Sequence, residues 1–113
     1  MPFIDSKITI PVSDEKKEII KSELGKAISI LRKTESYLMV GLIDNYDLWF
    51  AGKKLEKGAF VSVDILGEPA AKDCDKMTGA ICDILQKELD IPGKNVYVKY
   101  GGTENWGWNG SNF

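Results

Sequence analysis

The second residue of the chain is a proline, and Pro2 directly follows Met1 at the start of an apolar segment. Removal of the initiator Met would leave a secondary amine on Pro2. An α-amino group has an ordinary pKa of about 7.7 to 8.0, so it needs little adjustment to transfer protons near neutral pH. Pro2 is therefore a candidate general base, alongside a perturbed carboxylate, a perturbed lysine and a Cys thiolate.

The chain contains no His, which narrows the candidates for a general base. Imidazole is the side chain whose ordinary pKa lies between pH 5 and 8. Without it there is no Ser/His/Asp triad, no Cys/His pair and no His metal ligand. An apolar pocket beside a cation would lower the pKa of a Pro2 amine. A Met-Pro start is common, however, and does not assign a function by itself.

Composition indicates one soluble domain over residues 1–113. The chain has 15 Lys and Arg against 17 Asp and Glu, a net charge of −2. The lysines are scattered among acids, so we expect no nucleic-acid partner. No apolar run approaches the ~18 residues of a membrane span, and residues 1–7 lack the apolar core of a secretory signal, so we expect no membrane association.

Two cysteines, Cys74 and Cys82, fall two turns apart in one predicted helix. A disulfide between them would be strained, and their spacing matches no zinc or redox motif. We expect two reduced, small apolar side chains, no metal, no cofactor and a cytoplasmic location. Secretion without a signal peptide is the alternative location.

Hydrophobic periodicity predicts two similar halves. Alternation and apolar runs predict strands, apolar residues at helical spacing predict helices, and Ser13 is an N-cap. Leu48 to Phe50 suggests a short returning strand before a Lys-rich loop at 53–57. The main predicted elements are a strand at 3–10, a helix at 14–32, a strand at 37–43, a strand at 59–66, a helix that begins with Pro69 in its first turn and ends before 91–93, and a strand at 95–100.

The order strand-helix-strand, repeated, predicts an α/β two-layer sandwich. It consists of two pseudo-symmetric βαβ units on a four-stranded sheet, with right-handed crossovers placing both helices on one face. The uncharged run at 37–43 is typical of a central strand covered on both faces. Because two helices cover only one face and the strands appear apolar on both, we expect self-association.

Four segments together resemble the macrophage migration inhibitory factor family of the tautomerase superfamily. They are the Met1-Pro2-Phe3-Ile4 start, the junction at 33–37 (KTESY), the segment at 95–98 (NVYV) and the ending at 106–113 (WGWNGSNF). The resemblance covers essentially the whole chain, and the ending is its most specific part. It implies a homotrimer whose three sheets line an inner barrel.

The resemblance also implies roles for individual residues. Pro2 would be the general base that moves a proton between the enol oxygen and the α-carbon of an aromatic α-keto acid. Lys33 would neutralise the substrate carboxylate, and the backbone N–H of Leu66 would contact it. Tyr97 would come from a neighbouring subunit. The other candidates are an aromatic wall of Trp106, Trp108 and Phe113, and Tyr37 in the helix-to-strand junction.

Departures from the family pattern bear on specificity. Lys99 replaces the family's asparagine two residues after the tyrosine and would add a second cation near the pocket. The loop at 65–71 keeps only the family's glycine. Residues 58–61 read Gly-Ala-Phe-Val where some relatives have a CxxC, so no redox role is transferred.

Each candidate also has a structural interpretation. Lys33 could interact with a helix macrodipole, Tyr37 and Tyr97 could be core aromatics, and the tryptophans could anchor an interface. Asp64 fits a solvent-facing strand position better than a second pocket carboxylate. Two further functions stay open: a signalling protein that engages a receptor through its surface, and a ligand-binding module without catalysis.

Overall fold

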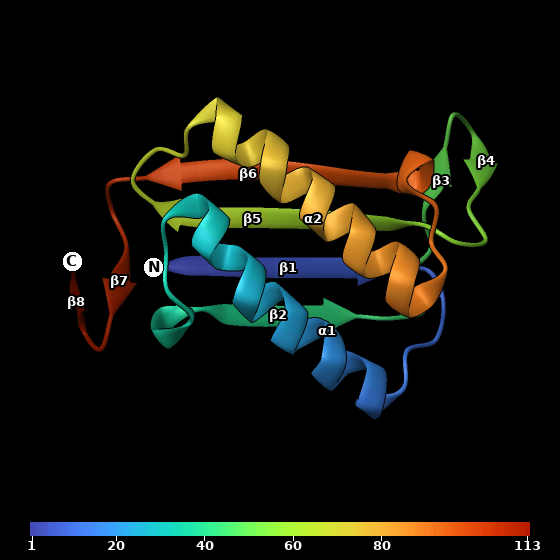
Figure 1. The fold of residues 1–113 in the computed structure, drawn as a ribbon, viewed down its shortest axis with the longest axis horizontal. Coiled ribbons are helices and arrows are strands. Elements are labelled where there is room, and N and C mark those ends of the chain that lie inside the picture. Colours follow the sequence, from blue (N-terminus) through green and yellow to red (C-terminus); the bar gives the residue numbers. More distant parts are fainter.

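The fold is a four-stranded sheet with two helices packed on one face (Figure 1). It is seen in a computed structural model that describes all residues from 1 to 113. Neither helix is long and apolar enough to cross a bilayer. The elements are β1 (Pro2–Ile8), α1 (Asp14–Ala27), β2 (Met39–Ile43), β3 (Trp49–Phe50), β4 (Lys53–Lys54), β5 (Ala59–Leu66), α2 (Ala71–Leu89), β6 (Val96–Thr103), β7 (Gly107–Trp108) and β8 (Ser111–Asn112).

The sheet confirms the predicted pair of βαβ units. Its strand order is β2-β1-β5-β6. β1 runs parallel to β2 and β5 runs parallel to β6, while the central pair β1 and β5 is antiparallel. Each helix therefore connects two parallel neighbours, and the two units meet at the β1–β5 pair.

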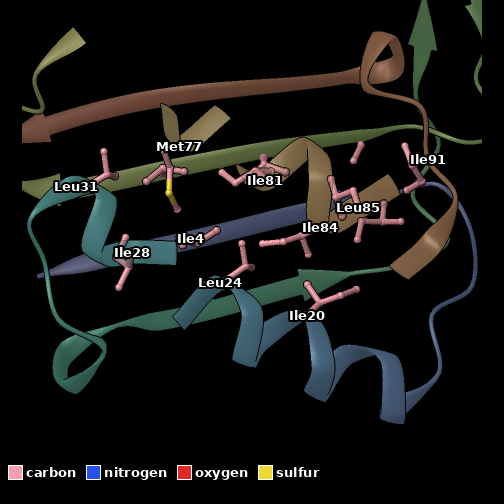
Figure 2. Close-up of a cluster of buried hydrophobic side chains, with 14 of the residues drawn as sticks. Ile4, Ile20, Leu24, Ile28, Leu31, Met77, Ile81, Ile84, Leu85 and Ile91 are labelled. Carbon is pink, nitrogen blue, oxygen red and sulfur yellow. The ribbon is translucent and has the colours of Figure 1, made fainter. Parts of the chain in front are cut away.

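The core lies between the helices and the sheet (Figure 2). β1 and β5 alternate strictly between buried and partly exposed positions, as period-2 patterning requires. The inward side chains of both strands meet the apolar stripes of α1 and α2. The fully buried members include Ile4 and Ile8 of β1, Val61 and Val63 of β5, Ile20 of α1, and Met77 and Ile81 of α2.

A truncation on α2 tests this packing. Ile81 is 1% exposed at the centre of the core. We expect Ile81→Ala to lower the free energy of unfolding by about 2 to 5 kcal/mol, since it removes buried methylenes and leaves a cavity. Chemical denaturation measures the change. Ile19→Ala is the matched control, because Ile19 is 41% exposed and its loss should cost under about 1 kcal/mol.

The predicted central position of the strand at 37–43 is wrong. β2 begins at Met39 and forms one edge of the sheet, while Tyr37 belongs to a short 3-10 turn, η2 (Glu35–Tyr37). Met39 and Ile43 are 69% and 50% exposed. An uninterrupted apolar run predicts burial but does not record how many strands flank it, so the edge position could not be distinguished.

The sheet face opposite the helices is more polar than predicted. Paired positions on that face include Asp64 opposite Phe3, and Lys99 opposite Ser62. Asp5 and Lys7 occupy the same parity of β1 as Phe3. Apolar side chains are concentrated toward the ends of this face, and charged groups occupy its middle.

Several element boundaries differ from prediction. β1 covers residues 2–8 instead of 3–10, and β6 covers 96–103 instead of 95–100. The helix predicted at 14–32 is α-helical only to Ala27 and continues as a 3-10 turn, η1 (Ile28–Leu31). This turn ends at Arg32, which adopts a left-handed conformation. Pro69 precedes α2, which begins at Ala71. Part of the Lys-rich loop pairs with β3 as β4, which forms a hairpin.

Candidate active site

Pro2 begins β1 and is fully buried, opposite Ile65 in the antiparallel register with β5. The preceding residue is held by the same ladder, because the Leu66 N–H donates to the Met1 carbonyl over 2.9 Å. Burial, and then the charge of Lys33, lower the pKa of the Met1 amine from its ordinary value of 8.0. The N-terminal amine therefore lies where its neutral form is favoured.

Lys33 lies beside the N-terminus because of the turn that ends η1. Arg32 has φ 64° and ψ 29°, and this left-handed residue reverses the chain just before Lys33. The Lys33 ammonium donates to the Leu66 carbonyl over 2.9 Å, and Lys33 forms no salt bridge in the chain. Both backbone polar groups of Leu66 are thus hydrogen-bonded, the N–H to Met1 and the carbonyl to Lys33.

An aromatic cluster flanks this end of the sheet. The Tyr37 ring lies 5.9 Å from the Trp108 ring and 6.3 Å from the Phe113 ring, both edge to face. Trp108 and Phe113 stack with centroids 5.8 Å apart. The Phe113 N–H donates to the Trp106 carbonyl over 3.0 Å, which closes the hairpin of β7 and β8. These arrangements use the offset and edge-to-face geometries that aromatic rings prefer.

The aromatic cluster and the N-terminus border one groove of about 510 Å³. Its lining is mostly apolar, and its size suits a molecule with one aromatic ring. Six of the lining residues were not predicted as site residues, although each lies within two positions of Pro2, Tyr37 or Trp106 along the chain. The lining residues are Met1, Pro2, Phe3, Ser36, Tyr37, Leu38, Met39, Trp106, Gly107 and Trp108.

Of the predicted site residues, Lys33 and Leu66 line a separate cavity and Phe113 lines neither, while Tyr97 and Lys99 lie away from both. Tyr97 pairs with Phe60, five residues along β5 from the Ile65 that faces Pro2, a separation of about 17 Å. Its ring packs edge to face on Phe50, with centroids 5.3 Å apart. Lys99 is exposed on the sheet face opposite the helices. Neither residue lines the groove beside Pro2.

The assembled groups can bind a carboxylate and transfer a proton. Lys33 supplies a cation and the N-terminal amine supplies a base, while the Leu66 N–H becomes a backbone donor only when it is released from the Met1 carbonyl. By contrast, burial and then neighbouring acids raise the pKa of the Cys74 and Cys82 thiols, which disfavours the reactive thiolate. No cluster of His, Cys, Asp or Glu capable of holding a metal ion is present.

Comparisons with known proteins show which family and fold the chain resembles. The family model described as "Macrophage migration inhibitory factor (MIF)" matches residues 1–113. The crystal structure of Leishmania major MIF2 is 32% identical, covers 100% of this chain and 97% of that one, and superposes with a TM-score of 0.93. Macrophage migration inhibitory factor of Xenopus laevis is 29% identical over 103 residues, which are 88% of this chain and 89% of the relative. The crystal structure of Pt0534 inactivated by 2-oxo-3-pentynoate shares the fold, with 18% identity and a TM-score of 0.82. The match covers 96% of this chain and 93% of that chain.

Proposed function

Because the chain belongs to the macrophage migration inhibitory factor family, we propose that it is a keto-enol tautomerase of aromatic α-keto acids such as phenylpyruvate. The observation that supports this most is the juxtaposition of three groups. The Met1 amine, whose pKa is lowered, the Lys33 ammonium, which has no acidic partner, and an aromatic groove lie at one end of the sheet, where removal of Met1 would leave the Pro2 amine.

The proposed reaction uses the amine of Pro2 after Met1 has been removed. The neutral amine accepts the proton of the enol oxygen on C2, and the C2 carbonyl forms as electrons of the carbon-carbon double bond shift to C3, the carbon next to it. That carbon takes a proton back from the protonated amine, so no proton is gained or lost overall. Lys33 holds the substrate carboxylate throughout, because a charge-assisted hydrogen bond is stronger than a neutral one.

Removal of Met1 would also supply a donor for the substrate. In the chain that carries Met1, its carbonyl accepts the Leu66 N–H. Without Met1 this N–H is free, and it lies beside the ammonium that bonds the carbonyl of the same residue. A substrate carboxylate placed there would find one cation and one backbone donor. The inactivation of Pt0534, which has the same fold, by 2-oxo-3-pentynoate supports a 2-oxo acid as the substrate class.

We further propose that the working form is a homotrimer. Tyr97 lies too far from Pro2 to serve the groove of its own chain, so a second subunit would have to supply it. The sheet has two open edges, β2 and β6, and one face without helices. Aromatic side chains are exposed near both ends of the sheet, with Trp49, Tyr97, Trp108 and Phe113 each more than half exposed. Such surfaces favour association between copies.

A direct assay tests the proposed activity. The intact mass of the purified protein is measured by mass spectrometry to establish whether Met1 is absent. The decay of the absorbance of the phenylpyruvate enol is then followed on the same sample. We expect catalysis well above the rate in buffer. A rate no higher than that of buffer, from protein that lacks Met1, would contradict the proposal.

A complementation experiment tests whether subunits share sites. Pro2→Gly and Tyr97→Ala should each reduce the tautomerase activity of the homotrimer. In trimers assembled from equal amounts of both chains, about a quarter of the sites would combine an intact Pro2 with an intact neighbouring Tyr97. We expect activity to return to about that fraction after co-refolding. A mixture no more active than the average of its two components would argue against a shared site.

A further inference from the structure

We infer that Arg32 is a positioning residue that keeps the Asp73 carboxylate away from Lys33, so that Lys33 stays free for the substrate. Arg32, Lys33 and Asp73 line one cavity of about 270 Å³, together with Leu66 and its neighbours in the following loop. The inference rests on the proposed function, because that function gives Lys33 its role in binding a carboxylate.

Asp73 is the acid that competes for Lys33. It lies in the first turn of α2, and its side chain is only 15% exposed. A carboxylate this buried requires a counter-charge or hydrogen-bond donors. Arg32 supplies the one salt bridge it has, with Nε 3.4 Å from Oδ2. Lys33, next in sequence, has no acidic partner and bonds only the Leu66 carbonyl.

The other acid of the cavity is directed elsewhere. Glu68 is exposed, and its carboxylate lies against Gly102 of β6, where an added Cβ would approach Oε2 to 2.8 Å. Asp73 is therefore the acid whose release would place a poorly solvated negative charge beside Lys33.

The backbone at Arg32 separates the two adjacent cations. Its φ of 64° is a conformation that favours Gly or Asn over long side chains. In this conformation Arg32 reaches α2 while Lys33 reaches the carbonyl at the end of β5. A long cationic side chain at a position that favours Gly is accounted for by the use of its guanidinium.

Three variants test the inference. Arg32→Gln frees Asp73 to pair with Lys33, and we expect KM for phenylpyruvate to rise about fivefold with kcat nearly unchanged, since substrate must displace that ion pair. Asp73→Asn removes the competitor and should leave KM at or below the wild-type value. The double variant Arg32→Gln with Asp73→Asn should recover the wild-type KM.

A merely structural ion pair would behave differently. Breaking it from either side would then have the same effect, and the double variant would stay impaired. That result, or an unchanged KM in Arg32→Gln, would overturn the inference. Arg32→Lys retains a cation at this position and should keep KM near wild type, which covers the case in which Arg32→Gln folds poorly.

A binding measurement separates this inference from the proposed function. The carboxylate 3-phenylpropionate has the ring and the acid but no keto group, so its Kd can be measured by NMR titration whether or not the protein is an enzyme. We expect the Kd to weaken about fivefold in Arg32→Gln and to recover in the double variant. Absent turnover with this pattern of Kd values would refute only the proposed function. Normal turnover with an unchanged Kd in Arg32→Gln would refute only the inference.

Discussion

A chain that keeps Met1 is expected to tautomerise phenylpyruvate at least about 100-fold more slowly than the processed chain, the usual scale of general acid-base catalysis. With Met1 in place, the Pro2 nitrogen is an amide and cannot accept a proton. The Met1 carbonyl also occupies the Leu66 N–H, and Met1 forms part of the groove lining. Both the base and one binding group are lost together.

The two forms can be compared in one protein background. Mass spectrometry separates preparations that retain Met1 from those that begin at Pro2, and kcat is measured on each. Pro2→Gly keeps an N-terminal amine but removes the ring that fixes its place on β1, and we expect a similarly large loss. Pro11→Gly is the matched control, since Pro11 is exposed beyond β1 and should leave kcat unchanged. Full activity in protein that keeps Met1 would refute Pro2 as the base.

Lys33→Ala is expected to reduce kcat/KM about 30- to 100-fold, chiefly through KM. A hydrogen bond to a charged group contributes about 1.5 to 3 kcal/mol, and each 1.4 kcal/mol corresponds to a factor of ten. Lys33→Arg should recover part of the loss because it preserves the positive charge. Lys26→Ala is the control, since Lys26 is exposed in the last turn of α1 and forms no salt bridge.

The same variant should also change the pH profile. Burial first, and Lys33 second, lower the pKa of the Met1 amine, and we expect the same two causes to act on the Pro2 amine that its removal would leave. Only the neutral amine is a base, so activity rises as pH increases through that pKa. Loss of Lys33 raises the pKa, and we expect the acidic limb of kcat/KM to move to higher pH. A limb that stays in place would show that Lys33 does not act on the base.

The sequence was informative where local pattern decides structure. The alternation in 59–66 and the helical spacing of Ile20, Leu24 and Ile28 correspond to the buried faces of β5, α1 and η1. Strand position was not available from pattern, because the run that became β2 is equally apolar whether one strand or two flank it. The sheet face opposite the helices was predicted to be apolar largely from the run at 37–43, whereas Asp5, Asp64 and Lys99 place charges on that face.

The candidate site divides along the same line. Pro2, Lys33 and Leu66 were predicted through the family resemblance, and the structure brings them together. Tyr97 does not lie beside them, because Pro2 and Tyr97 of one chain lie toward opposite ends of the sheet. The pairing of Arg32 with Asp73 was missed, since the two lie 41 residues apart (73 − 32 = 41) and neither segment carries a pattern that couples them.

The strand order also determines when, during synthesis, the four-stranded sheet can form. β1 is made first, yet its neighbours β2 and β5 end only at residues 43 and 66, and β5 supplies the antiparallel partner that joins the halves. Such non-local pairing is slow compared with helix formation. At synthesis rates of about 5 to 20 residues per second, β1 stays unpaired for several seconds. During that interval an aminopeptidase can reach Met1, and once β5 docks, the Leu66 bond holds Met1 in the ladder. The proposed removal of Met1 and the folding of the sheet would therefore compete in time for the same end of the chain.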